Sequence, residues 1–229
     1  MTALLCANAD GSHMTKPLII GKSKNPRAIK NIKQSLTAHY NNSRKAWMTA
    51  DIMIDWFHHK LVPEIRRFQI EELKIPASNV KAIVIIDNCP AHPPEESALK
   101  TVDGKISCMF LPPNTTSILQ PIDQGIYAVK RLYKKKFLND VLVVEIKDGE
   151  DTRGAETLEN LKNYTLKNMI YKFMEAVKEV TTKTLSNGWK KLLINEDTEL
   201  VIENCETEDS HQILQHNNEM VTLEDVDQW

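Results

Sequence analysis

The chain has 229 residues, of which 41% are hydrophobic and 26% are charged, so it can build one folded domain of ordinary size with an appended segment. Its longest apolar runs, such as residues 82–86, are far too short to span a bilayer, and the first ten residues have no basic flank of the secretory kind. Four cysteines without paired spacing argue against a disulfide framework or a zinc site and favour the cytosol or the nucleus.

The net charge of −2 is divided between two regions of opposite sign. Residues 195–229 carry 11 of the 31 acidic side chains and none of the 29 Lys and Arg residues, which leaves residues 1–194 with 20 acidic and 29 basic side chains, a net charge of +9. A basic body is typical of a protein that binds a polyanion, and an acidic tail either competes with that polyanion or solubilises the chain. We expect residues 195–229 to be a disordered acidic tail.

The first elements along the chain are typical of a β-hairpin. Residues 2–7 and 16–20 are short segments of strand composition, and Asp10-Gly11 between them is a strong turn signal. A third short strand is predicted at residues 45–48. The pattern therefore indicates the edge of a sheet at the start of the chain.

A helix is predicted directly after this third strand. Thr49 is a good N-cap, Asp51 suits the first turn, and apolar side chains recur at helical spacing as far as Phe68. Pro63 should kink this helix or begin a second one. The tryptophans at 47, 56 and 189 have apolar neighbours, so we interpret them as core anchors rather than platforms for base stacking.

Residues 80–87 are, apart from Lys81, a run of Ala, Ile and Val that ends in Asp87, as expected of a strand buried on both faces. This segment is the best candidate for a central strand. Residues 106–111 predict another strand, which Pro112-Pro113 stops.

A helix is predicted to begin near Pro121 and to carry apolar side chains on one face and cations on the other. The cations form a solvated face or, beside Asp123, contact phosphates; the candidate nucleic-acid-binding residues are Lys130, Arg131, Lys134 and Lys135. Residues 147–155 read as a flexible loop, and residues 163–184 as one last amphipathic helix.

Two aspartates stand where α/β proteins build their sites. Asp87 follows the buried strand and Asp123 begins a helix after the next strand, so both can face one crevice. Carboxylates from neighbouring elements suit Mg²⁺ or Mn²⁺, which in pairs activate water for phosphodiester cleavage. The structural alternative is that each aspartate caps the turn or helix that follows it.

Three blocks of sequence closely resemble the DDE transposase domain of the pogo, Tigger and jerky group. They are residues 87–93 (Asp-Asn-Cys-Pro-Ala-His-Pro), 110–117 (Phe-Leu-Pro-Pro-Asn-Thr-Thr-Ser) and 120–126 (Gln-Pro-Ile-Asp-Gln-Gly-Ile). Segments at 6–11, 16–27 and 46–50 are similar to the same family, so the resemblance extends to about residue 140, with a weaker likeness at 183–192. It implies that Asp87 and Asp123 are the second and third catalytic, metal-binding acids.

The resemblance also implies a first catalytic Asp, in an Asp-Glu-Thr-Gly segment upstream of residue 6, and these 229 residues contain no such segment. In the family that Asp lies on the first strand of a ribonuclease-H-like fold and bridges both metals. Asp10 is a poor substitute, because Asp-Gly between two strands reads as a turn. His92 either approaches the metal crevice or serves as a structural hydrogen-bonder.

We therefore expect an α/β protein with a ribonuclease-H-like mixed sheet flanked by helices and lacking its first strand. Its domain should span residues 1–194, with a core at 1–145 and a helical part at 156–194. The resemblance implies ancestral Mg²⁺- or Mn²⁺-dependent DNA cleavage, now inactive, in a domesticated nuclear protein that binds DNA weakly and without sequence preference. The alternatives are an active endonuclease whose first Asp lies outside this chain, and a protein-interaction module that uses only the fold.

Overall fold

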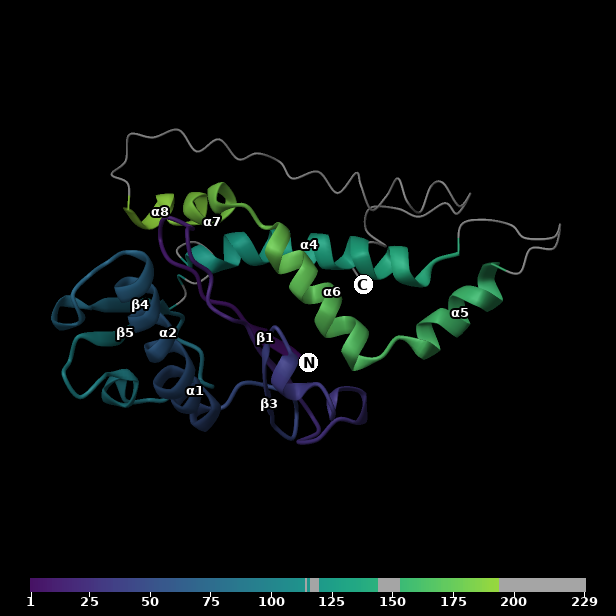
Figure 1. The fold of residues 1–229 in the computed structure, drawn as a ribbon, viewed down its shortest axis with the longest axis horizontal. Coiled ribbons are helices and arrows are strands. Elements are labelled where there is room, and N and C mark those ends of the chain that lie inside the picture. The colour runs from purple at the N-terminus through teal and green to yellow at the C-terminus, as the bar shows by residue number, and fades with distance from the viewer. Residues whose placement is uncertain (114, 116–119, 144–152, 194–229) are drawn as a thin grey trace. The chain divides into compact units, whose positions relative to one another are not determined.

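The computed structural model describes residues 1–113, 115, 120–143 and 153–193 (Figure 1). The acidic segment 195–229 lies outside the described residues. By its backbone contacts the chain divides into two compact units, Met1–Gly125 with Thr181–Ile194 and, second, Ile126–Val180. Each unit is considered by itself below.

The first unit holds two small sheets. In one, β1 (Thr2–Leu4) runs antiparallel to β2 (Leu18–Gly21), and β2 runs parallel to β3 (His39–Asn42). In the other, β4 (Ala82–Ile86) pairs in parallel with β5 (Ile106–Phe110). The unit is thus of mixed α/β type, as expected.

The predicted hairpin at the start of the chain is confirmed. Its turn is closed by the Asp10 carboxylate, which accepts hydrogen bonds from the backbone N–H and the hydroxyl of Ser12 at 2.9 and 2.7 Å. Gly11 follows with a φ of +72°, a conformation that side-chain-bearing residues rarely adopt. Asp10 therefore has the local turn-forming role that its sequence context predicts.

The third strand was predicted in the wrong place. Residues 45–48 lie outside any strand, and Ala46 has a φ of +57°, which no strand tolerates. The strand is instead β3, whose four polar or half-buried residues give no apolar signal and which exists because its backbone pairs with β2. Trp47, beside Ala46, is 69% exposed and is not a core anchor, whereas Trp56 is buried as predicted.

The long helical segment begins where it was predicted. Thr49 caps α1 (Ala50–Trp56), accepting the N–H of Ile52, and the segment continues through the π-helical η3 (Phe57–Leu61), α2 (Val62–Arg67) and the π-helical η4 (Phe68–Glu72). The N–H of Val62 bonds to the carbonyl of Phe57, five residues back, so the turn before Pro63 is widened. Pro63 accordingly begins a second helix, one of the two predicted outcomes.

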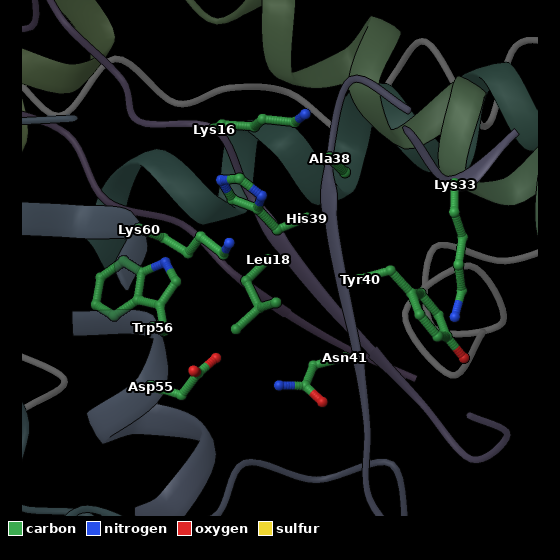
Figure 2. A pocket seen from close by; sticks show the side chains of 10 residues that line it. All are labelled: Lys16, Leu18, Lys33, Ala38, His39, Tyr40, Asn41, Asp55, Trp56 and Lys60. Carbon is green, nitrogen blue, oxygen red and sulfur yellow. The ribbon is translucent and has the colours of Figure 1, made fainter. Parts of the chain in front are cut away.

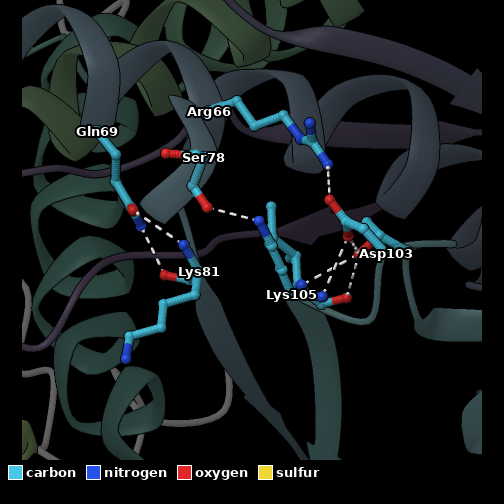
Figure 3. A network of polar contacts seen from close by, with 8 residues as sticks. Arg66, Gln69, Ser78, Lys81, Asp103 and Lys105 are labelled. Carbon is cyan, nitrogen blue, oxygen red and sulfur yellow. Dashed lines mark hydrogen bonds and ion pairs between the residues drawn. The ribbon is translucent and has the colours of Figure 1, made fainter. Parts of the chain in front are cut away.

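One buried cluster joins both sheets to this helical segment. Leu18 and Ile20 of β2, Val84 and Ile86 of β4, and Ile106 and Cys108 of β5 belong to the same core as Trp56, Phe57 and Leu61. Phe57, at 0% exposure, is its largest fully buried side chain. Polar contacts add to this core (Figure 3). Arg66 bonds to Asp103, Gln69 bonds to the backbone of Lys81, and the Lys105 ammonium donates to the carbonyl of Ser78.

The strand that ends at Asp87 departs from its prediction. Val84 and Ile86 are buried, but Ile83 is 67% exposed, so β4 is covered on one face and not on both. Among the described residues β4 pairs with β5 alone, whereas β5 also has an isolated bridge from Ser107 to Lys100. An apolar run cannot reveal whether both neighbours of a strand are present, and in the described part of the chain β4 has a neighbour on one side only.

The C-terminal helices are more numerous than predicted. Beyond α4 (Pro121–Val141), the described chain forms α5 (Arg153–Asn163), α6 (Leu166–Glu179), α7 (Thr182–Gly188) and α8 (Lys190–Leu193). The helix predicted at 163–184 is therefore two, because Thr165 and Thr181 each cap a new start and Val180 between them is extended. Of the predicted loop at 147–155, residues 153–155 open α5, and the rest lies outside the described residues.

Short helical turns complete the first unit, and aromatic pairs hold the second. The turns are the 3₁₀ segments η1 (Arg27–Ile29), η2 (Lys33–Ser35), η5 (Ala77–Asn79) and η6 (Glu96–Leu99). In the second unit, Phe137 of α4 packs edge-on against Tyr164 at 5.0 Å, and Tyr133 packs against Phe173 of α6. No helix in the described ranges is long and apolar enough to cross a membrane.

Gly11 also fixes the hairpin turn against α7. A Cβ at this position would lie 2.4 Å from the carbonyl oxygen of Thr182, whereas a Cβ at Gly104, which has a similar φ of +68°, would meet nothing closer than the flexible end of Lys100 at 3.4 Å. We expect Gly104→Ala to lower the free energy of unfolding by roughly 1–2 kcal/mol through backbone strain alone. Gly11→Ala should cost roughly 1–3 kcal/mol more, because backbone must also move.

Urea unfolding of the two variants measures this difference. Since both substitutions carry the same strain, only the contact with α7 separates them. Equal losses of stability would show that α7 does not rest on the hairpin turn.

Candidate functional site

The loop after β4 places Asp87 at the C-terminal end of a strand. The N–H of Leu111 bonds to the carbonyl of Ile86 at 2.8 Å, so pairing with the neighbouring chain continues to the residue before Asp87. The Asp87 side chain is 29% exposed. This aspartate therefore has a fixed backbone and a carboxylate that solvent can reach.

His92 closes the loop over Asp87. Its Nδ1 lies 2.9 Å from the Asp87 carbonyl oxygen and 3.3 Å from the carboxylate Oδ1, while its backbone N–H bonds to the carbonyl of Cys89. The ring is 11% exposed and its centroid is 6.2 Å from that of Phe110. The hydrogen-bonding role considered for His92 is thus confirmed, and its partner is Asp87.

Asp123 is the third residue of α4, after Pro121 at the start of the helix. Its backbone is helical, which agrees with the predicted helix start. Its side chain lies outside the described part of the structure. The distance between the carboxylates of Asp87 and Asp123 therefore lies outside the described structure, and their pairing stays a prediction.

The Asp87 carboxylate is the kind of ligand that a hard divalent cation prefers, but the described residues around it supply too few such ligands. A solvent-accessible carboxylate is a ligand that Mg²⁺ and Mn²⁺ favour. Among the side chains that the structure describes, no three His, Cys, Asp or Glu residues gather where they could hold one ion. The described residues thus supply a single acidic ligand here.

The basic residues predicted to contact nucleic acid lie on α4 in the second unit. Lys130 is exposed, while Arg131, Lys134 and Lys135 are half-buried, and Lys134 and Lys135 interact with neighbouring groups. The next residue, Lys136, pairs with Glu179 at 2.5 Å and with Glu175 at 3.8 Å. Of the four candidates, Lys130 is the most accessible to a phosphate.

A pocket lined by two lysines and a histidine was not predicted from the sequence. Lys16, His39 and Lys60 come from three separate segments of the first unit and line one pocket (Figure 2). No run of basic residues announces it, because the three are 23 and 21 positions apart along the chain. Only the pairing of β2 with β3 and the packing of the long helical segment bring them together.

Comparison with known proteins extends over nearly the whole chain. The family described as DDE superfamily endonuclease matches residues 1–189. Human Tigger transposable element-derived protein 7 is 39% identical over 229 residues, covering 99% of this chain. The human Jerky protein homolog is 33% identical and the mouse Jerky protein 35% identical, each over 192 residues and 84% of this chain.

These relatives are much longer than the chain, which spans 42% of the Tigger protein, 31% of the human Jerky homolog and 30% of the mouse Jerky protein. No solved structure matches the chain significantly. The resemblance found in the three sequence blocks is therefore confirmed by whole-chain similarity to the same group.

The contact between His92 and Asp87 can be tested by substitution. We expect His92→Ala to lower the free energy of unfolding by about 1–3 kcal/mol, because a half-buried carbonyl loses its donor. His59→Ala is the matched control: His59 also bonds to an aspartate, Asp55, at 3.0 Å, but on an exposed helix surface, where such pairs contribute at most about 1 kcal/mol. Urea titration measures both, and equal effects would contradict a locking role for His92.

Proposed function

The chain belongs to the DDE superfamily endonuclease family, and we propose that it is a transposase-derived, nuclear, nucleic-acid-binding protein whose endonuclease centre is degenerate. The observation that carries this proposal is the open edge of β4. The strand that leads to Asp87 has a neighbour on one side only among the described residues. That edge is where a ribonuclease-H-like sheet would place the strand with the first catalytic aspartate.

We infer that β1–β2–β3 and β4–β5 are two parts of one ribonuclease-H-like mixed sheet. The support is that side chains of both enter the same core around Phe57, although no hydrogen bonds join them in the described structure. A single strand with Asp-Glu-Thr-Gly at its end, outside these 229 residues, would pair with β4. The domain so formed would take in residues 1–194.

In this proposal Asp87 and Asp123 keep their ancestral roles as metal ligands without completing a catalytic site. A pair of bound Mg²⁺ or Mn²⁺ ions activates water and stabilises the leaving oxygen in phosphodiester cleavage. The residues of this chain would hold such ions by two carboxylates, with Asp87 oriented by His92. Two ligands without the bridging aspartate bind the ions too weakly and too loosely for that chemistry.

Binding of nucleic acid is proposed from charge. Residues 1–194 have a net charge of +9, and such an excess attracts a polyanion without reading its sequence. Lys130, with Arg131, Lys134 and Lys135, is the proposed contact on α4. A nuclear location follows from this partner and from the family.

A second candidate function is favoured by the same open edge. If a strand from outside these residues pairs with β4 and carries the first aspartate, the completed protein is an active endonuclease. The interaction-module alternative has no observation of its own to support it.

We expect the 229-residue chain to leave supercoiled DNA intact in Mg²⁺ or Mn²⁺. Conversion of supercoiled to nicked plasmid measures the activity, and Asp87→Ala supplies the background. Nicking that exceeds this background would refute the proposed inactivity. The decisive comparison adds an N-terminal family-type segment with Asp-Glu-Thr-Gly: gain of nicking that Asp87→Ala abolishes would establish the second candidate instead.

The acidic segment should compete with DNA for the basic body. We expect removal of residues 195–229 to tighten binding to a labelled duplex by roughly tenfold at low salt, because a tethered competitor has a high effective concentration. Fluorescence anisotropy across a salt series measures the affinity. A full-length variant with all eleven tail acids changed to amides is the control for length, and it should bind like the shortened chain; no gain in either would rule out competition by charge.

A further inference from the structure

The pocket of Figure 2 lies on the first unit, between the sheet of β1–β3 and the long helical segment. Its volume is about 260 Å³. Lys16 precedes β2, His39 and Asn41 belong to β3, and Asp55, Trp56 and Lys60 come from α1 and η3. It includes neither Asp87 nor any residue of α4.

Two lysines of the lining, Lys16 and Lys60, have ammonium groups without a partner in the described part of the chain. Among the described residues, neither the Lys16 nor the Lys60 ammonium makes a hydrogen bond or ion pair. Lys33, at the rim, differs, because its ammonium bonds to the carbonyl of Lys24 at 2.6 Å and to the side chain of Asn25 at 3.0 Å. The single acid of the lining, Asp55, is bonded to His59. Among the described residues, the lining thus holds more positive than negative charge.

The pKa of His39 responds to these two positive charges. Burial, together with the charges of Lys16 and Lys60, lowers the pKa of the His39 imidazole to about 4. The ring is therefore neutral near pH 7 and offers one N–H donor and one acceptor without adding to the repulsion. Among the described residues, the charges that act on the pKa of this ring are those of the two lysines, and no carboxylate offsets them.

The framework of the pocket is fixed before any ligand arrives. The backbone N–H of Lys16 donates to both oxygens of the Glu64 carboxylate, at 3.0 and 3.2 Å. His39 is held opposite Leu18 by the β2–β3 pairing, and the Trp56 ring forms a buried wall. A preorganised site loses less conformational entropy on binding.

We propose that this pocket binds a phosphate group, with Lys16 and Lys60 as its charge partners and the side chains of His39 and Asn41 as hydrogen-bonding groups. The phosphate belongs either to the backbone of a nucleic acid or to a small phosphorylated molecule. The nucleic-acid source rests on the proposed function, whereas the small-molecule source is independent of it. Lysine ammoniums converging from separate elements are well suited to phosphate oxygens.

The test compares two double variants that remove the same charge. Lys16→Gln with Lys60→Gln alters the pocket, and Lys22→Gln with Lys30→Gln removes two exposed lysines that do not line it. The probes are inorganic pyrophosphate, titrated by calorimetry at pH 7, and a labelled single-stranded oligonucleotide, followed by anisotropy. Urea midpoints for both variants establish that each is folded.

We expect the pocket variant to lose at least roughly tenfold in affinity, equivalent to about 1.4 kcal/mol, for at least one probe, while the control variant stays near the parent chain. Loss for both probes assigns the phosphate to nucleic acid, and loss for pyrophosphate alone assigns it to a small molecule. In the parent chain the bound probe should also shift the ring signals of His39 in proton NMR, assigned with His39→Gln.

Equal behaviour of the two double variants toward both probes would overturn the proposal, since binding would then depend on net charge alone. A parent chain that binds pyrophosphate in the pocket but no oligonucleotide would contradict the proposed nucleic-acid function and leave the phosphate site standing.

Discussion

The burial of one helical segment against both sheets is the constraint on which the first unit depends. A two-stranded and a three-stranded sheet with strands of three to five residues are marginal on their own. Phe57, Trp56 and Leu61 supply the apolar surface against which both become stable, within one core. The same segment bears the polar contacts to Lys81 and Asp103, so it sets the place of β4 and hence of Asp87.

This constraint links the two sites of the unit. Trp56 belongs to the core and also forms a wall of the basic pocket, and Lys60 projects from the next turn. At β4, the core holds Val84 and Ile86, while His92 secures the residue that follows. The chain thus uses apolar packing to fix backbone positions and leaves charged or polar groups at the margins, where they remain accessible.

The edges of the sheets have consequences for stability as well as for function. Among the described residues β4 is paired on one side only, which leaves backbone N–H and C=O groups to which another strand can add, and natural proteins usually cover such edges. The two candidate functions, a degenerate nuclease and an enzyme completed by an outside strand, therefore share this edge in the described part of the chain. They differ in whether a partner strand occupies it, which is a matter of binding and not of the core.

The sequence by itself determined the family, because blocks such as residues 87–93 and 120–126 are long and specific. It also determined the hairpin turn at Asp10-Gly11 and the cap at Thr49, because the signals for a turn and a cap are local. It predicted β3 wrongly, because a strand of half-buried polar residues exists only through its pairing with β2. The exposure of Ile83 was equally inaccessible, since an apolar run does not state how many neighbours a strand has. The contact of His92 with Asp87 is local, but its geometry depends on the turn between them, which the sequence did not specify. The meeting of Lys16, His39 and Lys60 was decided by tertiary structure alone, because electrostatic interactions depend on distances in space that separation along the chain does not fix.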